Sequence, residues 1–266
     1  MNTTAYFKDQ ISSNYFEVRN EIDVKMGEND FKAFSTYDIF MKKTPNENYD
    51  LLVDRLKFKV NGEAIQNKFS KVSDHYFKCI FPIKFSISDE LKVANYEEIT
   101  QRINEKDQQL QDEMQGEGLQ YIRNQFIEST NTPEKLEQLI LSLGIVKIIN
   151  LSLQRYSPEE TISFEWMTPI IGKTFWKKNE GAVAENQSYS YENSDCDNLK
   201  NFFNQYRIKN KLEEIDTDVA IKTSLEHKIN YVNDSFFFTA SKTAVKVEIE
   251  NYFDYKETIT LKSMLE

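Results

Sequence analysis

The residues with the most distinctive chemistry are two histidines and two cysteines, and their spacing suits neither catalysis nor a structural metal. His75 and Cys79 share one face if their segment is a strand, whereas Cys196 and His227 follow more than a hundred residues later. Structural zinc sites use closely spaced ligand pairs, which this chain lacks. A nucleophile would need an adjacent histidine and an orienting acid, and no Gly-x-Ser-x-Gly turn occurs. We therefore assign no catalytic residue, no metal ligand and no cofactor.

The sequence Ile171-Gly172-Lys173-Thr174 ends like a phosphate-binding P-loop. That motif needs a glycine five residues before its Gly-Lys pair, so that backbone amides can surround the phosphates. Met167 occupies that position, and Pro169 lies inside the would-be loop. An ordinary turn after a strand is the better interpretation.

Carboxylate pairs are the remaining groups that could do chemistry. Asp195 with Asp197, and Asp216 with Asp218, could hold a hard cation or act as acid and base. Because the chain has 43 acidic residues, such pairs arise often by chance, and solvated loops are expected. Whether Asp216 and Asp218 bind a cation stays open at this point.

Aromatic residues gather around a polar, acidic stretch, residues 179–197, which has five acids and no base. A field of one sign favours encounter with an oppositely charged partner, and aromatic rings supply the desolvated anchor. The alternative places Trp166 and Phe175 in the core and the tyrosines on a strand. The candidate partner-binding residues are Trp176, Glu185, Tyr189, Tyr191, Glu192 and Asp195.

The charge of the whole chain agrees with a basic partner. The net charge is −10 and the sequence pI is near 5.0. A nucleic-acid-binding protein needs a basic surface to displace counterions, so nucleic acid is not expected as a partner. A protein partner more basic than this chain is expected, although a charge of −10 also serves simply to keep a protein in solution.

The ends and the hydropathy of the chain predict a cytoplasmic location. Residues 1–10 lack the basic and apolar regions of a signal peptide, and no apolar run approaches the ~20 residues that span a bilayer. Export by a leaderless route stays open. Lysine far outnumbers arginine and asparagine is abundant, which is typical of an AT-rich genome and indicates a bacterial or phage origin.

Alternation of apolar and polar residues predicts strands in the first third of the chain. The segments 16–26, 31–41, 55–60 and 77–87 follow this pattern. Gly27 falls in a turn between the first two, and Asn61-Gly62 is a strong hairpin signal after the third.

The middle of the chain is predicted to be helical. Asn95 and Glu98 resemble a capping box, and a helix over 133–143 is expected from Thr132 as N-cap, Pro133 at its first position and Gly144 beyond its end. The apolar stretch 145–156 fits a strand or a buried helix equally well.

Strand patterns return in the last third, most clearly over 219–231, with a final hairpin of 245–250 and 258–262. The expected fold is α+β, with a mainly antiparallel, curved sheet and a helical insert at about residues 95–145 packed against it. We expect one domain over 1–266, with a β-rich part at 1–94, helices at 95–157 and a second β-rich part at 158–266.

Two classes of function remain from the sequence. The favoured one is a non-catalytic interaction protein, such as an adaptor, a chaperone, an immunity-type inhibitor or a component of a phage or secretion assembly, which binds a basic protein. The alternative is a small-molecule or lipid-binding protein with an apolar cavity between the curved sheet and the helices.

Overall fold

The computed structural model describes residues 13–44, 49–87, 91–111, 116–153, 163–168, 172–178, 188–193, 196–209, 211–215, 219–231 and 237–264. Its helices, in chain order, are α1 (Lys68–Ile80), α2 (Tyr96–Leu110), α3 (Glu117–Thr130), α4 (Pro133–Ser142), α5 (Gly144–Leu153) and α6 (Cys196–Lys209). Its strands are β1 (Ser13–Met26), β2 (Asn29–Lys43), β3 (Leu51–Val60), β4 (Ile83–Ile87), β5 (Leu91–Val93), β6 (Ser163–Thr168), β7 (Gly172–Lys178), β8 (Ser188–Asn193), β9 (Ile221–Tyr231), β10 (Phe238–Ile249) and β11 (Phe253–Ser263).

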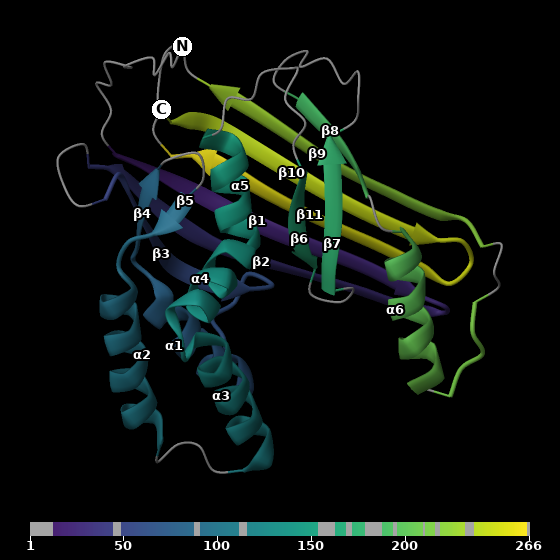
Figure 1. Cartoon of the computed structure of the whole chain (residues 1–266), viewed down its shortest axis with the longest axis horizontal. Coiled ribbons are helices and arrows are strands. Elements are labelled where there is room, and N and C mark those ends of the chain that lie inside the picture. The colour runs from purple at the N-terminus through teal and green to yellow at the C-terminus, as the bar shows by residue number, and fades with distance from the viewer. Residues whose placement is uncertain are drawn as a thin grey trace.

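The described strands form one sheet, in the order β5-β4-β3-β2-β1-β11-β10-β9-β8-β7-β6. Every pairing is antiparallel, including the long central one between β1 and β11 that joins the two ends of the chain. The predicted α+β fold with a mainly antiparallel sheet is confirmed (Figure 1).

The sheet curves back over its own inner face, as a single contact demonstrates. Trp166 on β6 donates its indole N–H to Glu257 on β11, at 3.2 Å. In the sheet order β10, β9, β8 and β7 lie between these two strands, so a flat sheet could not bring them together. Figure 1 shows β6 and β7 in front of β10, β11 and β1.

Alternation explains the central strands. Along β1 the odd positions from Tyr15 to Arg19 are exposed, whereas Phe16 and Val18 are fully buried. Successive side chains of a strand point to opposite faces, so one face meets water and the other builds the core. The helical insert covers part of that inner face, with α5 against β10 and α4 against β6 (Figure 1).

The predicted helix at 133–143 is confirmed as α4. The Thr132 hydroxyl accepts the Lys135 amide at 3.3 Å, and Pro133 opens the helix. The ambiguous stretch after it begins as helix α5, with Ile145, Ile148 and Ile149 buried. No single helix among the described residues has the length and apolar character needed to cross a bilayer; α4 and α5 reach both only together, with a bend of 76° between them.

The prediction of a strand over 77–87 is wrong in its first half, where α1 lies. Asn67 caps α1 by accepting the Phe69 amide at 2.8 Å, and Val72, Tyr76 and Ile80 are buried at helical spacing. The residues at every second position from Phe77 are also apolar, and this chance alternation imitates the pattern of a strand. The strand β4 begins only at Ile83. Consequently His75 and Cys79 are one turn apart on a helix, where the Cys79 thiol bonds the His75 carbonyl oxygen at 3.2 Å.

Two local predictions differ in detail. Asn61 and Gly62 adopt positive φ, as their turn requires, but a single bridge from Val60 to Glu63 follows and the chain then enters α1 instead of a second hairpin strand. Asn95 precedes α2 as expected but makes no capping bond to that helix; its side-chain oxygen accepts the Lys84 amide at 2.9 Å.

The described apolar side chains of the interior form two clusters. The larger one lies between the sheet and the helices α1 to α5. The smaller one lies under α6, where Leu199 and Phe203 pack with Phe253 and Tyr255 of β11. Figure 1 shows α6 near the end of the sheet where β10 turns into β11, away from the other helices.

Candidate functional site

The structure places the candidate partner-binding residues on two strands, as far as it describes them. Tyr189, Tyr191 and Glu192 belong to β8, which pairs with β7 and β9. A strand occupies residues 188–193 and α6 begins at Cys196, so part of the acidic stretch 179–197 is regular secondary structure. Glu185 and Asp195 lie outside the described residues, as do Asp216 and Asp218.

Trp176 lies in the core and not on the surface. Its side chain is 0% exposed, and its indole N–H donates to the Thr174 hydroxyl at 2.8 Å. Strand alternation is the cause, because Trp176 and Thr174 share the inner face of β7 while Lys173 and Lys177 on the outer face are exposed. Direct contact between Trp176 and a partner would therefore require the sheet to open.

Helix α6 supplies exposed aromatic side chains that the sequence analysis did not select. Leu199 and Phe203 face the smaller apolar cluster, whereas Phe202 and Tyr206 are 44% and 41% exposed. Residues four apart lie on the same side of a helix, so these two rings form one patch. The available signal was the pair Phe202-Phe203, because adjacent residues of a helix lie about 100° apart and a narrow buried stripe takes only one of the two.

The segment after α6 fixes the position of that helix. Arg207 donates its Nε–H to the Glu213 carbonyl oxygen, and the Asn204 side-chain oxygen accepts the Ile215 amide at 2.9 Å. Ile215 is buried in the smaller cluster, and the Arg207 guanidinium lies 4.8 Å from the centre of the Tyr252 ring. The aromatic patch of α6 is therefore presented by an anchored helix.

The inner face of the sheet carries a buried carboxyl group at Glu257, which is 4% exposed. It accepts hydrogen bonds from Trp166 Nε1 at 3.2 Å, the Tyr255 hydroxyl at 3.1 Å and Asn20 Nδ2 at 3.2 Å. All three donors are neutral, so burial dominates and raises the pKa of Glu257 above its usual range. The signal in the sequence was a charged residue on the inward row of Phe253, Tyr255, Ile259 and Leu261.

His227 lies on the same inner face, two strands away. It is fully buried, and its Nδ1 lies 2.8 Å from the Thr243 hydroxyl. Burial removes the imidazolium ion from water, which lowers the pKa of His227 to about 4. His227 is therefore neutral at physiological pH.

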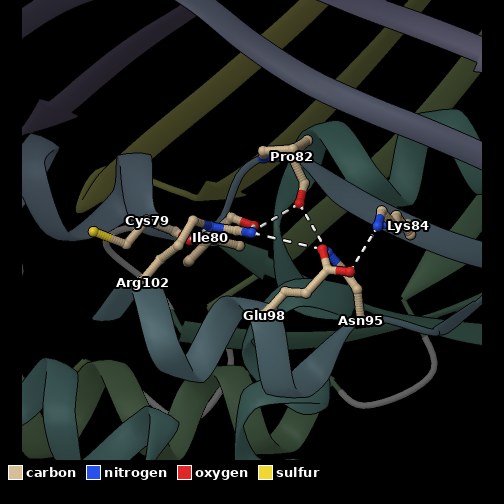
Figure 2. Close-up of polar contacts among 7 residues, drawn as sticks. All are labelled: Cys79, Ile80, Pro82, Lys84, Asn95, Glu98 and Arg102. Carbon is tan, nitrogen blue, oxygen red and sulfur yellow. Dashed lines mark hydrogen bonds and ion pairs between the residues drawn. The ribbon is translucent and has the colours of Figure 1, made fainter. Parts of the chain in front are cut away.

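A second polar network ties α1, β4 and α2 together (Figure 2). Arg102 donates from Nε to the Cys79 carbonyl oxygen at 2.9 Å, and from Nη2 to those of Ile80 at 3.2 Å and Pro82 at 3.0 Å. These carbonyls lie at or just beyond the end of α1, where backbone acceptors lack intrahelical partners. This network stabilises the fold, because Arg102 donates its hydrogen bonds to backbone carbonyl oxygens.

Glu98 completes this network from the first turn of α2. It accepts the Lys84 ammonium at 2.7 Å and Asn95 Nδ2 at 3.3 Å (Figure 2). The hydrogen bond from Lys84 is the main reason that the pKa of Glu98 lies below its usual value. This group is a charged carboxylate that pairs with a cation, and it is not poised for acid–base chemistry near neutral pH.

A hollow of about 470 Å³ opens where α4 and α5 meet the hairpin of β6 and β7. Lys135, Lys147 and Lys173 line it together with Glu165, and its apolar wall includes Leu139 and Met167. Within the described part of the chain, no three His, Cys, Asp or Glu residues are grouped closely enough to hold a metal ion.

Comparison with known proteins does not assign this chain to a family. No family model matches this chain, and no curated protein matches it. Among solved structures it is similar to one of lipovitellin that concerns lipid–protein interactions, with 9% identity and a TM-score of 0.45. The match covers 97% of this chain and 25% of the lipovitellin chain.

Proposed function

We propose that this protein is a non-catalytic interaction protein that binds a protein partner more basic than itself. The observation that supports this most is the pair of exposed aromatic rings, Phe202 and Tyr206, on an anchored helix that begins at the end of the acidic stretch 179–197. We call Phe202 and Tyr206 the α6 patch. An adaptor, a chaperone, an immunity-type inhibitor and an assembly component all fit this chemistry.

The charge distribution supports a basic partner over an acidic one. The chain carries −10 overall, and Glu180, Glu185, Glu192, Asp195 and Asp197 follow one another with no lysine or arginine between them. A field of one sign raises the rate of encounter with the opposite sign and is weakened by salt. The acidic stretch would therefore govern association.

The α6 patch would govern dissociation. Aromatic side chains dominate the energetics of many interfaces because they bury a large area with little conformational entropy lost. Both rings are exposed, and Phe202 is not part of the smaller apolar cluster; Tyr206 also stacks on Phe203 of that cluster, with ring centres 6.3 Å apart, so the stability of its variant is measured alongside binding. The two parts of the site can thus be tested separately.

Affinity capture with matched variants tests the proposal. Immobilised protein should enrich a basic protein from a lysate of its host, and Phe202→Ser with Tyr206→Ser should lose that protein. The control is Tyr121→Ser, which removes an aromatic ring that is 65% exposed on α3, and it should retain the captured protein. Capture that is equal with all three proteins would contradict the proposal.

The alternative function, binding of a small molecule or lipid, is favoured by one observation, the hollow beside α4. Its lining differs from the apolar cavity expected from the sequence, because three lysines contribute to it.

A further inference from the structure

The hollow between α4, α5, β6 and β7 has the size of a small-molecule site. Its volume of about 470 Å³ lies within the range of roughly 300–1,000 Å³ that is typical of ligand pockets. Its walls come from α3, α4 and α5 of the insert and from β6 and β7 of the sheet, so a ligand there would contact both. The α6 patch lies elsewhere in the fold (Figure 1), and this hollow is independent of the proposed protein interface.

Its charge is opposite to that of the whole protein. Lys135 of α4, Lys147 of α5 and Lys173 of β7 line it, and Glu165 is the acidic residue beside them. Among the described residues that line it, three positive charges and one negative charge give a local balance of about +2, in a chain of −10. Concave surfaces with an excess of one sign of charge concentrate ions of the opposite sign, so this excess of positive charge favours anions over cations.

The lysines carry the donors that an anion would need, and each of the three already has a partner in the fold. Ser129 and Ser142 also line the hollow, but their hydroxyls donate to the carbonyl oxygens of Phe126 and Leu139. Lys135 donates to the Glu128 carbonyl oxygen at 3.1 Å, and an ammonium group has two further donors. Lys173 lies 3.2 Å from Glu165, so that carboxylate competes with any anion for it.

The remaining wall is apolar. Leu139 and Leu141 are half-buried, and Met167 is 39% exposed on the outer face of β6. A flexible thioether side chain adapts to ligands of irregular shape. An anion with an apolar tail would pair with the lysines and cover these side chains at the same time.

We propose that this hollow binds a small amphipathic anion, with one anionic head held by Lys135, Lys147 and Lys173 and a short apolar tail on Leu139, Leu141 and Met167. Head and tail contribute together. The ligand therefore binds more tightly than either part alone.

Titration calorimetry with decanoate tests the proposal, with acetate and decanol as probes of the head and the tail. Decanoate should bind with a stoichiometry of one, and both acetate and decanol should bind at least about tenfold more weakly, because buried methylenes and the ion pair each contribute. Decanoate that gives no binding, or acetate that binds equally well, would overturn the proposal.

Variants of the lining distinguish this site from nonspecific adsorption. Lys173→Gln should weaken decanoate binding about two- to fivefold, whereas Glu165→Gln should strengthen it by a similar factor because it releases Lys173 from its competing partner. Met167→Asp should abolish binding. Lys177→Gln is the control, since Lys177 is exposed on the same face of β7 but does not line the hollow.

Thermal unfolding of each variant shows that it is folded before it is titrated. Opposite shifts for Lys173→Gln and Glu165→Gln, with no change for Lys177→Gln, support the site. Equal affinities of the wild-type protein and all four variants for decanoate would show that decanoate binds elsewhere and would overturn the proposal.

Discussion

Trp166 and Glu257 are 91 residues apart in sequence and are joined by a buried hydrogen bond of 3.2 Å from the indole nitrogen to the carboxyl oxygen. The bond fixes the last strand of the sheet order, β6, over the inner face of β11, near the middle of that order. The curvature of the sheet is thus secured at a polar contact inside an apolar interior.

Replacement of Glu257 by Gln should make the protein less sensitive to alkaline pH. Burial raises the pKa of Glu257 in the folded state, so its contribution to stability is complete below the ordinary value near 4.5 and is lost as pH rises through the folded pKa. Glutamine stays neutral, and its oxygen can accept from Trp166 and Tyr255. Urea unfolding at pH 5 and pH 8 should show a smaller loss of unfolding free energy in the variant; identical losses would contradict the account.

Replacement of His227 by Gln should make the stability of the protein less sensitive to acid pH. Its folded pKa is lowered to about 4, so the unfolded chain takes up a proton first as pH falls below about 6.5, and stability is lost down to about pH 4. The shift corresponds to about 3 kcal/mol. In His227→Gln, the unfolding free energy should change less between pH 7 and pH 4 than in wild type. Parallel pH curves would show that His227 is accessible to protons in the folded state.

The inner and outer faces of β9 should respond differently to truncation. Leu225 is fully buried, so Leu225→Ala should lower the unfolding free energy by roughly 2–5 kcal/mol. Lys222 faces solvent and pairs with Glu248 at 3.3 Å, so Lys222→Ala should change it by no more than about 0.5 kcal/mol. Chemical denaturation measures both. Similar losses would mean that both faces of β9 are covered.

The long strands and α4 could be predicted from the sequence because their signals are local. Alternation along β1 and β9 follows from one wet face and one buried face, and Thr132 with Pro133 marks a helix start. The helix α1 could not be separated from a strand by alternation, since Phe77, Cys79 and Phe81 alternate as in a strand. In the same segment Val72, Tyr76 and Ile80 follow helical spacing. Its cap at Asn67 was the deciding signal.

Arg102 should stabilise the junction of α1, β4 and α2 through its three carbonyl partners (Figure 2). Arg102→Met should lower the unfolding free energy by about 2–4 kcal/mol, because carbonyl oxygens lose a charged donor. Arg102→Lys should restore only part of this loss, since one ammonium group cannot reproduce the planar fork. Gln101→Ala, at an exposed neighbouring position, is the control. A loss below about 0.5 kcal/mol for Arg102→Met would contradict this role.

The candidate site was less predictable than the fold. Composition identified the acidic stretch, but whether Trp176 or Phe202 reaches the surface depends on which face of β7 or α6 meets the core. That orientation is set by contacts between segments far apart in sequence, such as Phe203 with Phe253. The lysines of the hollow come from three separate elements and have no common sequence signal.

Association kinetics at two salt concentrations test the central claim of a basic protein partner most directly. Once the captured partner is purified, surface plasmon resonance should show that neutralising Glu185, Glu192 and Asp195 together slows association and flattens its dependence on salt. Two single variants test the anchor: Tyr189→Ala tests the one expected from the sequence, and Tyr206→Ala tests the α6 patch. Each should speed dissociation, and the loss of a ring that serves as an anchor should weaken the binding free energy by about 1–2 kcal/mol. Wild-type affinity of the neutralised protein at low salt, with unchanged dissociation of Tyr206→Ala, would contradict the claim.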